Sequence, residues 1–485
     1  MASQTKKITL DTAAIFFGRT VGLLLGMVRL NFLARYLGVA GFGILNFATY
    51  FCSLFQVLFD FGISQILTRD LSRDQTRSRE LVGKALLLKV IIAFFSSLVM
   101  GGFAFLSGFD RTTNWAILLT TLTFAINGIT MVFLSAFQAH RRMILVSLAN
   151  ILNDLLISIA IILVIQDFPY VVAALIVTAV VSAANLGVLF VVYCKAVGVP
   201  EFRADMALWK ALLRESAPIA VSTVGISMYM FAGPTVLKYT RGDVEVGVFS
   251  AGYKLISILT LIPAAFTQVV FPIFSDFYAN AREKLEKALR DSLRVMCLIS
   301  IPLAAGIIVL TPKIFQILYP PEFEPGMIVL QVIVAANILG YMNWVFYSFL
   351  LAVGRQVSLM KISVGVGALH VVGCLLAVPK YGFVAIPLIV AATELTLLGA
   401  QLSRVRKCGY DPMLVPSCGK PLVAVAASSA LYAILYPTDP FLITVVGALA
   451  YAITLYAIRG FGAQEKEMLD KILGMLSGRR GGPLS

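Results

Sequence analysis

Charged side chains interrupt long apolar stretches of this chain, and their types and positions could do chemistry. Arg19 and Arg29, the latter close to Asn31, lie in the first apolar stretch, and Lys254 lies in a later one. A guanidinium can hold an oxyanion with two parallel hydrogen bonds, and an ammonium adds a point charge. These four residues therefore predict a binding site for an anionic group.

Three carboxylates occupy comparable positions. Asp60, Asp154 and Glu394 lie inside apolar stretches, where a charge costs on the order of a few kcal/mol unless it faces water or a partner. Each could exchange a coupling cation such as H⁺ or Na⁺, or serve only as a structural partner of a base, as Arg19 could be for Asp60. Both interpretations stay open. Lysines closer to the ends of the stretches, including Lys89, are expected to reach the interface with their long side chains.

The composition places these residues in a bilayer. The 485 residues have a mean hydropathy of +0.90, with 59% hydrophobic and 13% charged side chains, whereas a soluble domain has about 25% charged residues. So few charges cannot cover a soluble surface of this size. We therefore predict an all-α polytopic membrane protein.

The length of the apolar stretches sets the number of helices. Because a hydrocarbon core of about 30 Å needs about 20 residues of helix, we expect about fourteen transmembrane helices. The first is expected to remain in the mature protein, since no small-residue cleavage site precedes it. The expected spans are residues 11–37, 41–68, 81–106, 114–138, 143–166, 170–194, 216–237, 246–272, 289–311, 326–352, 358–378, 382–403, 421–436 and 441–458.

The basic residues predict the orientation. By our count about 27 of the 39 lysines and arginines lie on one face of the predicted membrane and about five on the other. The basic face is expected to be cytoplasmic, which places both termini in the cytoplasm and the chain in the cell membrane. Since the net charge of +14 is confined to short loops, it does not indicate nucleic-acid binding.

A weak internal repeat suggests how the helices are organised. Residues 41–48 resemble residues 245–252, an offset of about 204 residues, which fits parallel units of six helices each. Two pseudo-symmetric bundles with a cavity between them are therefore expected, followed by two additional helices. The expected divisions are an N-terminal bundle (1–194), a cytoplasmic linker (195–215), a C-terminal bundle (216–403), and two helices with a cytoplasmic tail (404–485).

Short motifs in both halves resemble one known family, the polysaccharide biosynthesis proteins, which are oligosaccharide flippases of the multidrug/oligosaccharidyl-lipid/polysaccharide (MOP) exporter superfamily. One departure concerns the seventh helix, where many relatives carry an acidic residue and this chain has Gly233 and Pro234. The role of that acid cannot be transferred. The matching segments are Leu33 to Gly43, Phe59 to Ile63, Thr68 to Asp70, Glu245 to Lys254, and Phe271 with Pro272.

The resemblance implies a transporter that works by alternating access. Its substrate would be a lipid-linked oligosaccharide or polysaccharide precursor on a carrier of the polyprenyl diphosphate type, whose diphosphate would meet Arg19, Arg29, Asn31 and Lys254. An alternative within the superfamily is a cation-coupled exporter of small molecules or drugs. No cofactor and no metal site is expected, because the six cysteines lack metal-ligand spacing.

An enzyme that processes glycans in the membrane is the alternative from another class. Such an enzyme needs a catalytic constellation, but the longest outer segment, Pro312 to Pro325, offers only Glu322 and Glu324. His140 and His370 are far apart in the chain. We therefore do not expect an enzyme.

Two basic stretches with helical spacing could contact other molecules. Residues 195–215 and 275–294 combine basic and apolar side chains. They are expected to be interfacial connecting helices, or to bind lipid headgroups or enzymes of glycan assembly.

Overall fold

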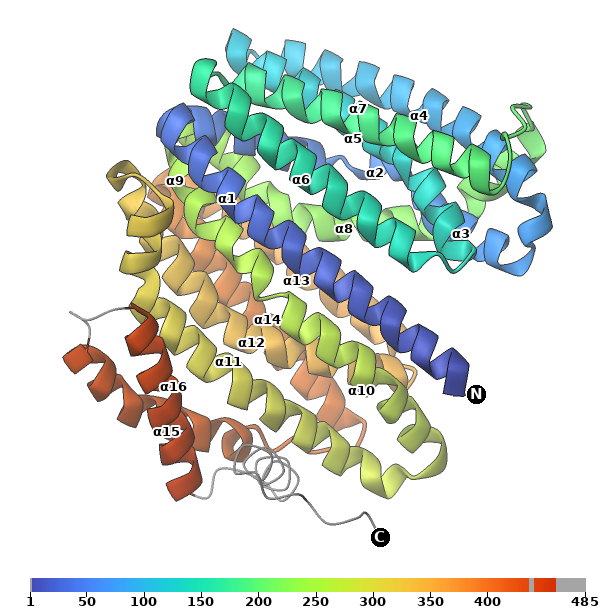
Figure 1. Cartoon of the computed structure of the whole chain (residues 1–485). Helices are drawn as coiled ribbons and strands as arrows, with labels where there is room; N and C mark the ends of the chain where they lie inside the picture. Colours follow the sequence, from blue (N-terminus) through green and yellow to red (C-terminus); the bar gives the residue numbers. More distant parts are fainter. Residues whose placement is uncertain (1, 436–439, 459–485) are drawn as a thin grey trace. The chain divides into compact units, whose positions relative to one another are not determined.

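The computed structural model describes residues 2–435 and 440–458, and every regular element in these ranges is a helix (Figure 1). This confirms the predicted all-α class. In the described part of the chain, ten helical stretches are long and apolar enough to cross a membrane, so the chain is a multi-pass membrane protein. Two of them, Asp243–Asn280 and Gln356–Lys407, each contain two α-helices. The count of about fourteen crossings remains a prediction.

Each expected span coincides with one or more of the described helices. The α-helices are α1 (Ala2–Leu54), α2 (Val57–Asp60), α3 (Ile63–Arg73), α4 (Ser78–Leu106), α5 (Arg111–Ala139), α6 (Met143–Asp167), α7 (Val171–Ala196), α8 (Met206–Arg241), α9 (Asp243–Lys254), α10 (Leu261–Asn280), α11 (Arg282–Leu318), α12 (Met327–Ala352), α13 (Gln356–Tyr381), α14 (Ala385–Lys407), α15 (Leu414–Leu435) and α16 (Pro440–Ala457). Short 3-10 helices are η1 (Gln75–Arg77), η2 (Leu255–Ile258), η3 (Pro321–Gly326) and η4 (Gly382–Val384).

Two glycines with positive φ mark where one expected span ends and the next begins. Gly38, inside α1, has φ 64° and ψ −179°, and Gly242, between α8 and α9, has φ 85° and ψ −168°. This combination is essentially restricted to glycine. The two positions are separated by the same offset as the sequence repeat, so the repeat is present in the backbone as well.

The starts of the two repeated segments also cross each other at close range. A Cβ on Gly43 would collide with the carbonyl oxygen of Asp243, and a Cβ on Gly247 would collide with that of Val39. These two contacts are equivalent under the repeat offset. Glycine is therefore required at both crossing positions, because any side chain would push the backbones apart.

The described chain packs as two compact units. Unit 1 contains the described residues up to Lys254 together with Phe315–Val329 and Gly367–Ile389. In this unit α1 packs along α6, while α4, α5 and α7 run side by side (Figure 1). One of its core clusters includes Leu71, Phe133 and Tyr193. The predicted division into two six-helix bundles stays a prediction.

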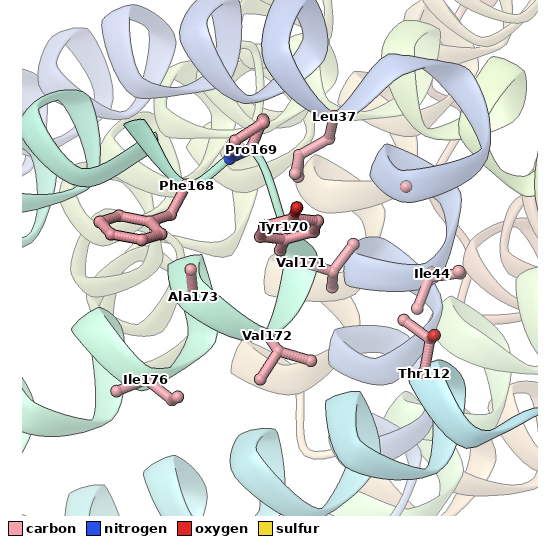
Figure 2. A pocket seen from close by; sticks show the side chains of 11 residues that line it. Leu37, Ile44, Thr112, Phe168, Pro169, Tyr170, Val171, Val172, Ala173 and Ile176 are labelled. Carbon is pink, nitrogen blue, oxygen red and sulfur yellow. The ribbon is translucent and has the colours of Figure 1, made fainter. Parts of the chain in front are cut away.

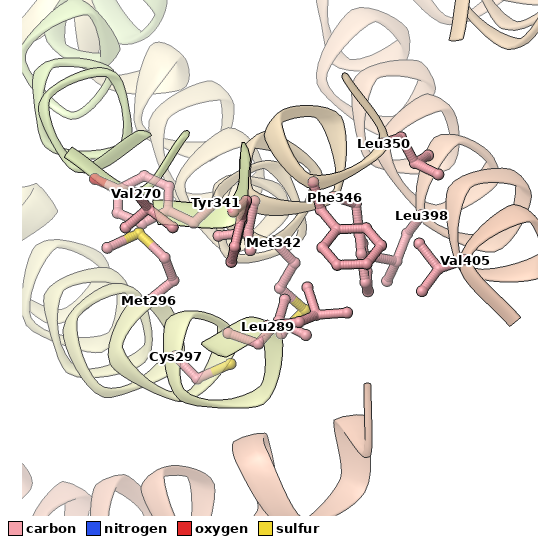
Figure 3. Close-up of a cluster of buried hydrophobic side chains, with 14 of the residues drawn as sticks. Val270, Leu289, Met296, Cys297, Tyr341, Met342, Phe346, Leu350, Leu398 and Val405 are labelled. Carbon is pink, nitrogen blue, oxygen red and sulfur yellow. The ribbon is translucent and has the colours of Figure 1, made fainter. Parts of the chain in front are cut away.

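Unit 2 contains Leu255–Ile314, Leu330–Val366 and the described residues from Val390 onward. Side chains from α10, α11, α12 and α14 form its core (Figure 3). Leu285, Leu289 and Leu293 are fully buried in this core. The apolar face of the 275–294 stretch was expected at the membrane interface. The structure packs this face against other helices of its own unit, and the place of the stretch at the interface stays a prediction.

Candidate functional site

The candidate site begins where α1 meets α6 in unit 1. Arg29 and Gly22 lie two helical turns apart and so share a face of α1. The Oδ2 atom of Asp154, from α6, lies 2.7 Å from the place of a Cβ on Gly22, so the missing side chain gives the carboxylate access to α1. Arg29 and Asp154 lie close enough within the unit to interact electrostatically.

A second cation comes from the end of α9. Lys254 is its last residue, after which the chain tightens into η2. Its Nζ lies 5.6 Å from the ring centroid of Phe42, within the range of a cation–π contact. The Phe42 ring is fully buried and packs edge-on against Phe323 at 5.4 Å between centroids. Lys254 also interacts electrostatically with Arg29. The structure thus brings Arg29, Asp154 and Lys254 together.

Asn31, also expected at this site, is occupied elsewhere. Its Nδ2 donates hydrogen bonds to the carbonyl oxygens of Ile317 and Leu318, at 3.0 and 2.8 Å. These carbonyls end α11 and have no partner inside the helix. Asn31 therefore caps α11. The side chain of Arg19 lies outside the described residues, although its backbone belongs to α1.

Asp60 is paired with Lys89, a partner that the sequence did not suggest. The Nζ of Lys89 donates hydrogen bonds to the carboxylate of Asp60 and to the carbonyl oxygens of Phe59 and Asp60, at 3.3 and 3.1 Å. Lys89 is fully buried, so the expectation that it reaches the interface is wrong. The physical reason is that Lys89 satisfies backbone carbonyl oxygens at a helix break. The expected span 41–68 is interrupted after Leu54, and the carbonyls freed at this break need donors.

Glu394, in unit 2, has a neutral partner that the sequence analysis did not identify. The Nδ2 of Asn343 lies 2.7 Å from Oε2 of Glu394 and 3.0 Å from its backbone oxygen. Asn343 sits in an apolar stretch, and this polar interruption was the signal that could have indicated it.

The linker before α8 is held against α4 by an ion pair between Lys84 and Asp205. Lys84 contacts the carboxylates of Glu80 and Asp205 at 2.7 and 2.8 Å, and the indole of Trp209 donates to the Lys84 carbonyl at 2.9 Å. Hydrogen bonds from the Leu208 backbone and from Lys84 hold the pKa of Asp205 below its usual range. This cluster holds the linker in place and is separate from the Arg29 site.

A largely apolar cavity of about 490 Å³ lies beside the Gly38 break (Figure 2). Leu37, Phe168 and Tyr170 line it, and none of Arg29, Asp154 and Lys254 does. An apolar lining suits hydrocarbon better than an anion. This cavity is therefore not part of the charged site.

Comparisons with known proteins agree with this architecture. The signature of the polysaccharide biosynthesis protein family matches residues 8–278, and the MatE signature matches residues 218–376. A probable low-salt glycan biosynthesis flippase, Agl15 of Haloferax volcanii, is 24% identical over 131 residues, which are 27% of this chain and 28% of that protein. The aligned region thus spans under a third of that relative.

Solved structures of transporters share the fold. The lipid II flippase MurJ in its inward closed conformation superposes with a TM-score of 0.75 at 14% identity, covering 93% of this chain and 98% of MurJ. An inward-facing multidrug resistance MATE transporter of the MOP superfamily gives a TM-score of 0.65 at 17% identity, and the superposition covers 80% of this chain and 95% of the transporter. A MOP transporter from Pyrococcus furiosus gives a TM-score of 0.57 at 15% identity, and the superposition covers 83% of this chain and 95% of that transporter.

Proposed function

This chain belongs to the polysaccharide biosynthesis protein family of the MOP superfamily, and from that premise we propose that it flips a lipid-linked oligosaccharide or polysaccharide precursor across the cytoplasmic membrane. The families that match and the structural neighbours are transporters, so the chain is a membrane transporter and not an enzyme. Similarity to a glycan flippase and to MurJ supports the choice of substrate class. The carrier would be of the polyprenyl diphosphate type.

The observation that carries this proposal is the meeting of Arg29 with Lys254. Among the described groups that interact electrostatically with Arg29, one is a carboxylate, Asp154, and one is a second cation. An entering diphosphate would add negative charge beside both cations. Arg29 would form a bidentate contact with phosphate oxygens, and Lys254 would add a point charge.

Movement of the anionic headgroup could draw on the membrane potential. Carrying one charge through the potential is worth about 2.3 kcal/mol per 100 mV. Asp154 and Glu394 are the candidates for additional coupling to H⁺ or Na⁺. If either carboxylate exchanges a cation, its amide variant, Asp154→Asn or Glu394→Gln, will transport without responding to an imposed ion gradient. A structural carboxylate would instead lower the yield of folded protein when replaced, with the gradient response intact.

A cation-coupled exporter of drugs is the second candidate, favoured by the MatE signature over residues 218–376. The two functions differ in the charge of the substrate. Two cations at the site favour an anionic substrate and disfavour the cationic dyes that drug exporters are tested with.

Transport by purified protein in vesicles separates the candidates. Lipid-linked glycan, isolated from cells depleted of this chain, is compared with a cationic dye. We expect Arg29→Ala and Lys254→Ala to lose at least about tenfold of glycan transport, and Arg29→Lys to retain part of it. Lys361→Ala is the control, because Lys361 is an exposed lysine in a predicted span. Dye transport without glycan transport, or glycan transport by both alanine variants at the unmodified rate, refutes the proposal.

A further inference from the structure

A groove of about 680 Å³, lined mostly by apolar and uncharged polar side chains, lies in unit 1 beside the break in the second span. Its walls are the segment Gln56 to Gly62, helices α3 and α5, and Thr223 of α8. Four amide side chains line this groove: Gln56, Gln65, Asn127 and Gln138. The groove is distinct from the Arg29 site, since none of Arg29, Asp154 and Lys254 lines it.

The amides of the groove are available for hydrogen bonding. Across the described residues, none of the four side chains has a hydrogen-bond partner in the protein. Gln56, Gln65 and Asn127 are exposed, and Gln138 is half-buried. An amide that meets neither water nor a partner within a membrane costs several kcal/mol. The groove is therefore a place for water or for a polar ligand.

The groove extends along the half of α5 that is predicted to lie on the cytoplasmic side of the membrane. Asn127 and Gln138 lie on one face of α5, separated by about three helical turns. In the predicted orientation α5 runs toward the cytoplasm, and Gln138 precedes the exposed basic residues Arg141 and Arg142. A headgroup arriving from the cytoplasmic leaflet would thus pass a basic rim and then meet the amides.

The lining selects an uncharged hydroxyl-rich ligand. The one carboxylate of the groove, Asp60, is already paired with Lys89. Amides donate and accept hydrogen bonds at once, as the hydroxyl and acetamido groups of sugars do. Phe61 and Phe124 also line the groove and can pack against the apolar face of a pyranose ring.

We propose that this groove binds the sugar portion of the lipid-linked substrate, while the Arg29 site binds its diphosphate. The proposal rests on the proposed function and deepens it. It separates two recognition tasks, since amides recognise hydroxyls and cations recognise phosphate. Variants of the groove should therefore change discrimination between carriers with and without sugar.

Vesicle transport with two probes tests the groove. The first probe is the lipid-linked glycan isolated from cells depleted of this chain, and the second is the polyprenyl diphosphate without sugar. Gln65→Leu and Asn127→Leu should each lose about five- to tenfold of transport efficiency toward the glycan, as expected for lost hydrogen bonds. Transport of the bare carrier should be unchanged. Asn185→Leu is the matched control, because Asn185 lies in a predicted span outside the groove.

The outcomes are distinguishable from failure of the proposed function. If the unmodified protein moves no lipid-linked glycan, the proposed function fails. If it does, and the groove variants lose both probes equally or lose neither, the groove proposal fails. Should a leucine variant not fold, Gln65→Ser and Asn127→Ser keep a polar lining with a shorter reach. They should give the same selective loss.

Discussion

Replacing Lys89 by methionine is expected to destabilise the protein strongly. The ammonium is fully buried and serves the Asp60 carboxylate and two backbone carbonyls. Removing one partner of a buried pair costs about 3–5 kcal/mol. The Asp60 side chain is 36% exposed, so water will solvate part of the orphaned charge. We therefore expect a loss near the lower limit, about 3 kcal/mol.

Unfolding by SDS titration in mixed micelles measures this loss. The variants are Lys89→Met, Asp60→Asn and the double variant, which together form a double-mutant cycle. The double variant should recover about 1–2 kcal/mol relative to Lys89→Met, because no carboxylate is left without its cation. Arg77→Met is the control. Arg77 pairs with Glu80 on the surface with 52% of its side chain exposed, so stability should hardly change.

Two results would refute the reasoning. A Lys89→Met variant as stable as the Arg77→Met control would mean that water reaches the ammonium. Strict additivity of the two single replacements would mean that Lys89 and Asp60 do not interact, and the break would then need another stabilising partner.

Further expectations concern the crossing of the repeats, the orientation and the linker. Gly247→Ala should prevent folding or lower the yield sharply, whereas Gly187→Ala, which meets no atom within 4 Å, should be tolerated; equal yields would disprove the close crossing. In a background without native cysteines, a membrane-impermeant thiol reagent should label Thr240→Cys but not Ser72→Cys in intact cells, and the reverse pattern would overturn the orientation. Because the folded-state pKa of Asp205 is lowered, its contribution to stability is complete above the usual value of about 4. This contribution of Asp205 is lost as the pH falls through its lowered pKa. Limited proteolysis should therefore cleave the linker faster at such a low pH, and an unchanged rate would contradict the ion pair between Asp205 and Lys84.

The sequence alone determined the properties that depend on composition and local order. Low charge and uninterrupted apolar stretches of about 20 residues indicate helices, because lipid admits only helices and closed barrels and a barrel strand spans the bilayer with about half as many residues. The repeat was also readable. The glycines at 38 and 242 follow its offset, since each turn needs a backbone conformation that essentially only glycine adopts.

The tertiary structure decided which charges meet. From the sequence, Arg19 was a possible partner of Asp60 and Lys89 was expected at the interface, but the packing of α4 against the helix break brings Lys89 to Asp60. Asn31 looked like a donor for a ligand, yet it caps α11, a helix far away in the chain. The position of a residue within an apolar stretch indicates its depth in the membrane but not the rotation of its helix. The partner of a buried charge depends on that rotation, and packing between helices sets it.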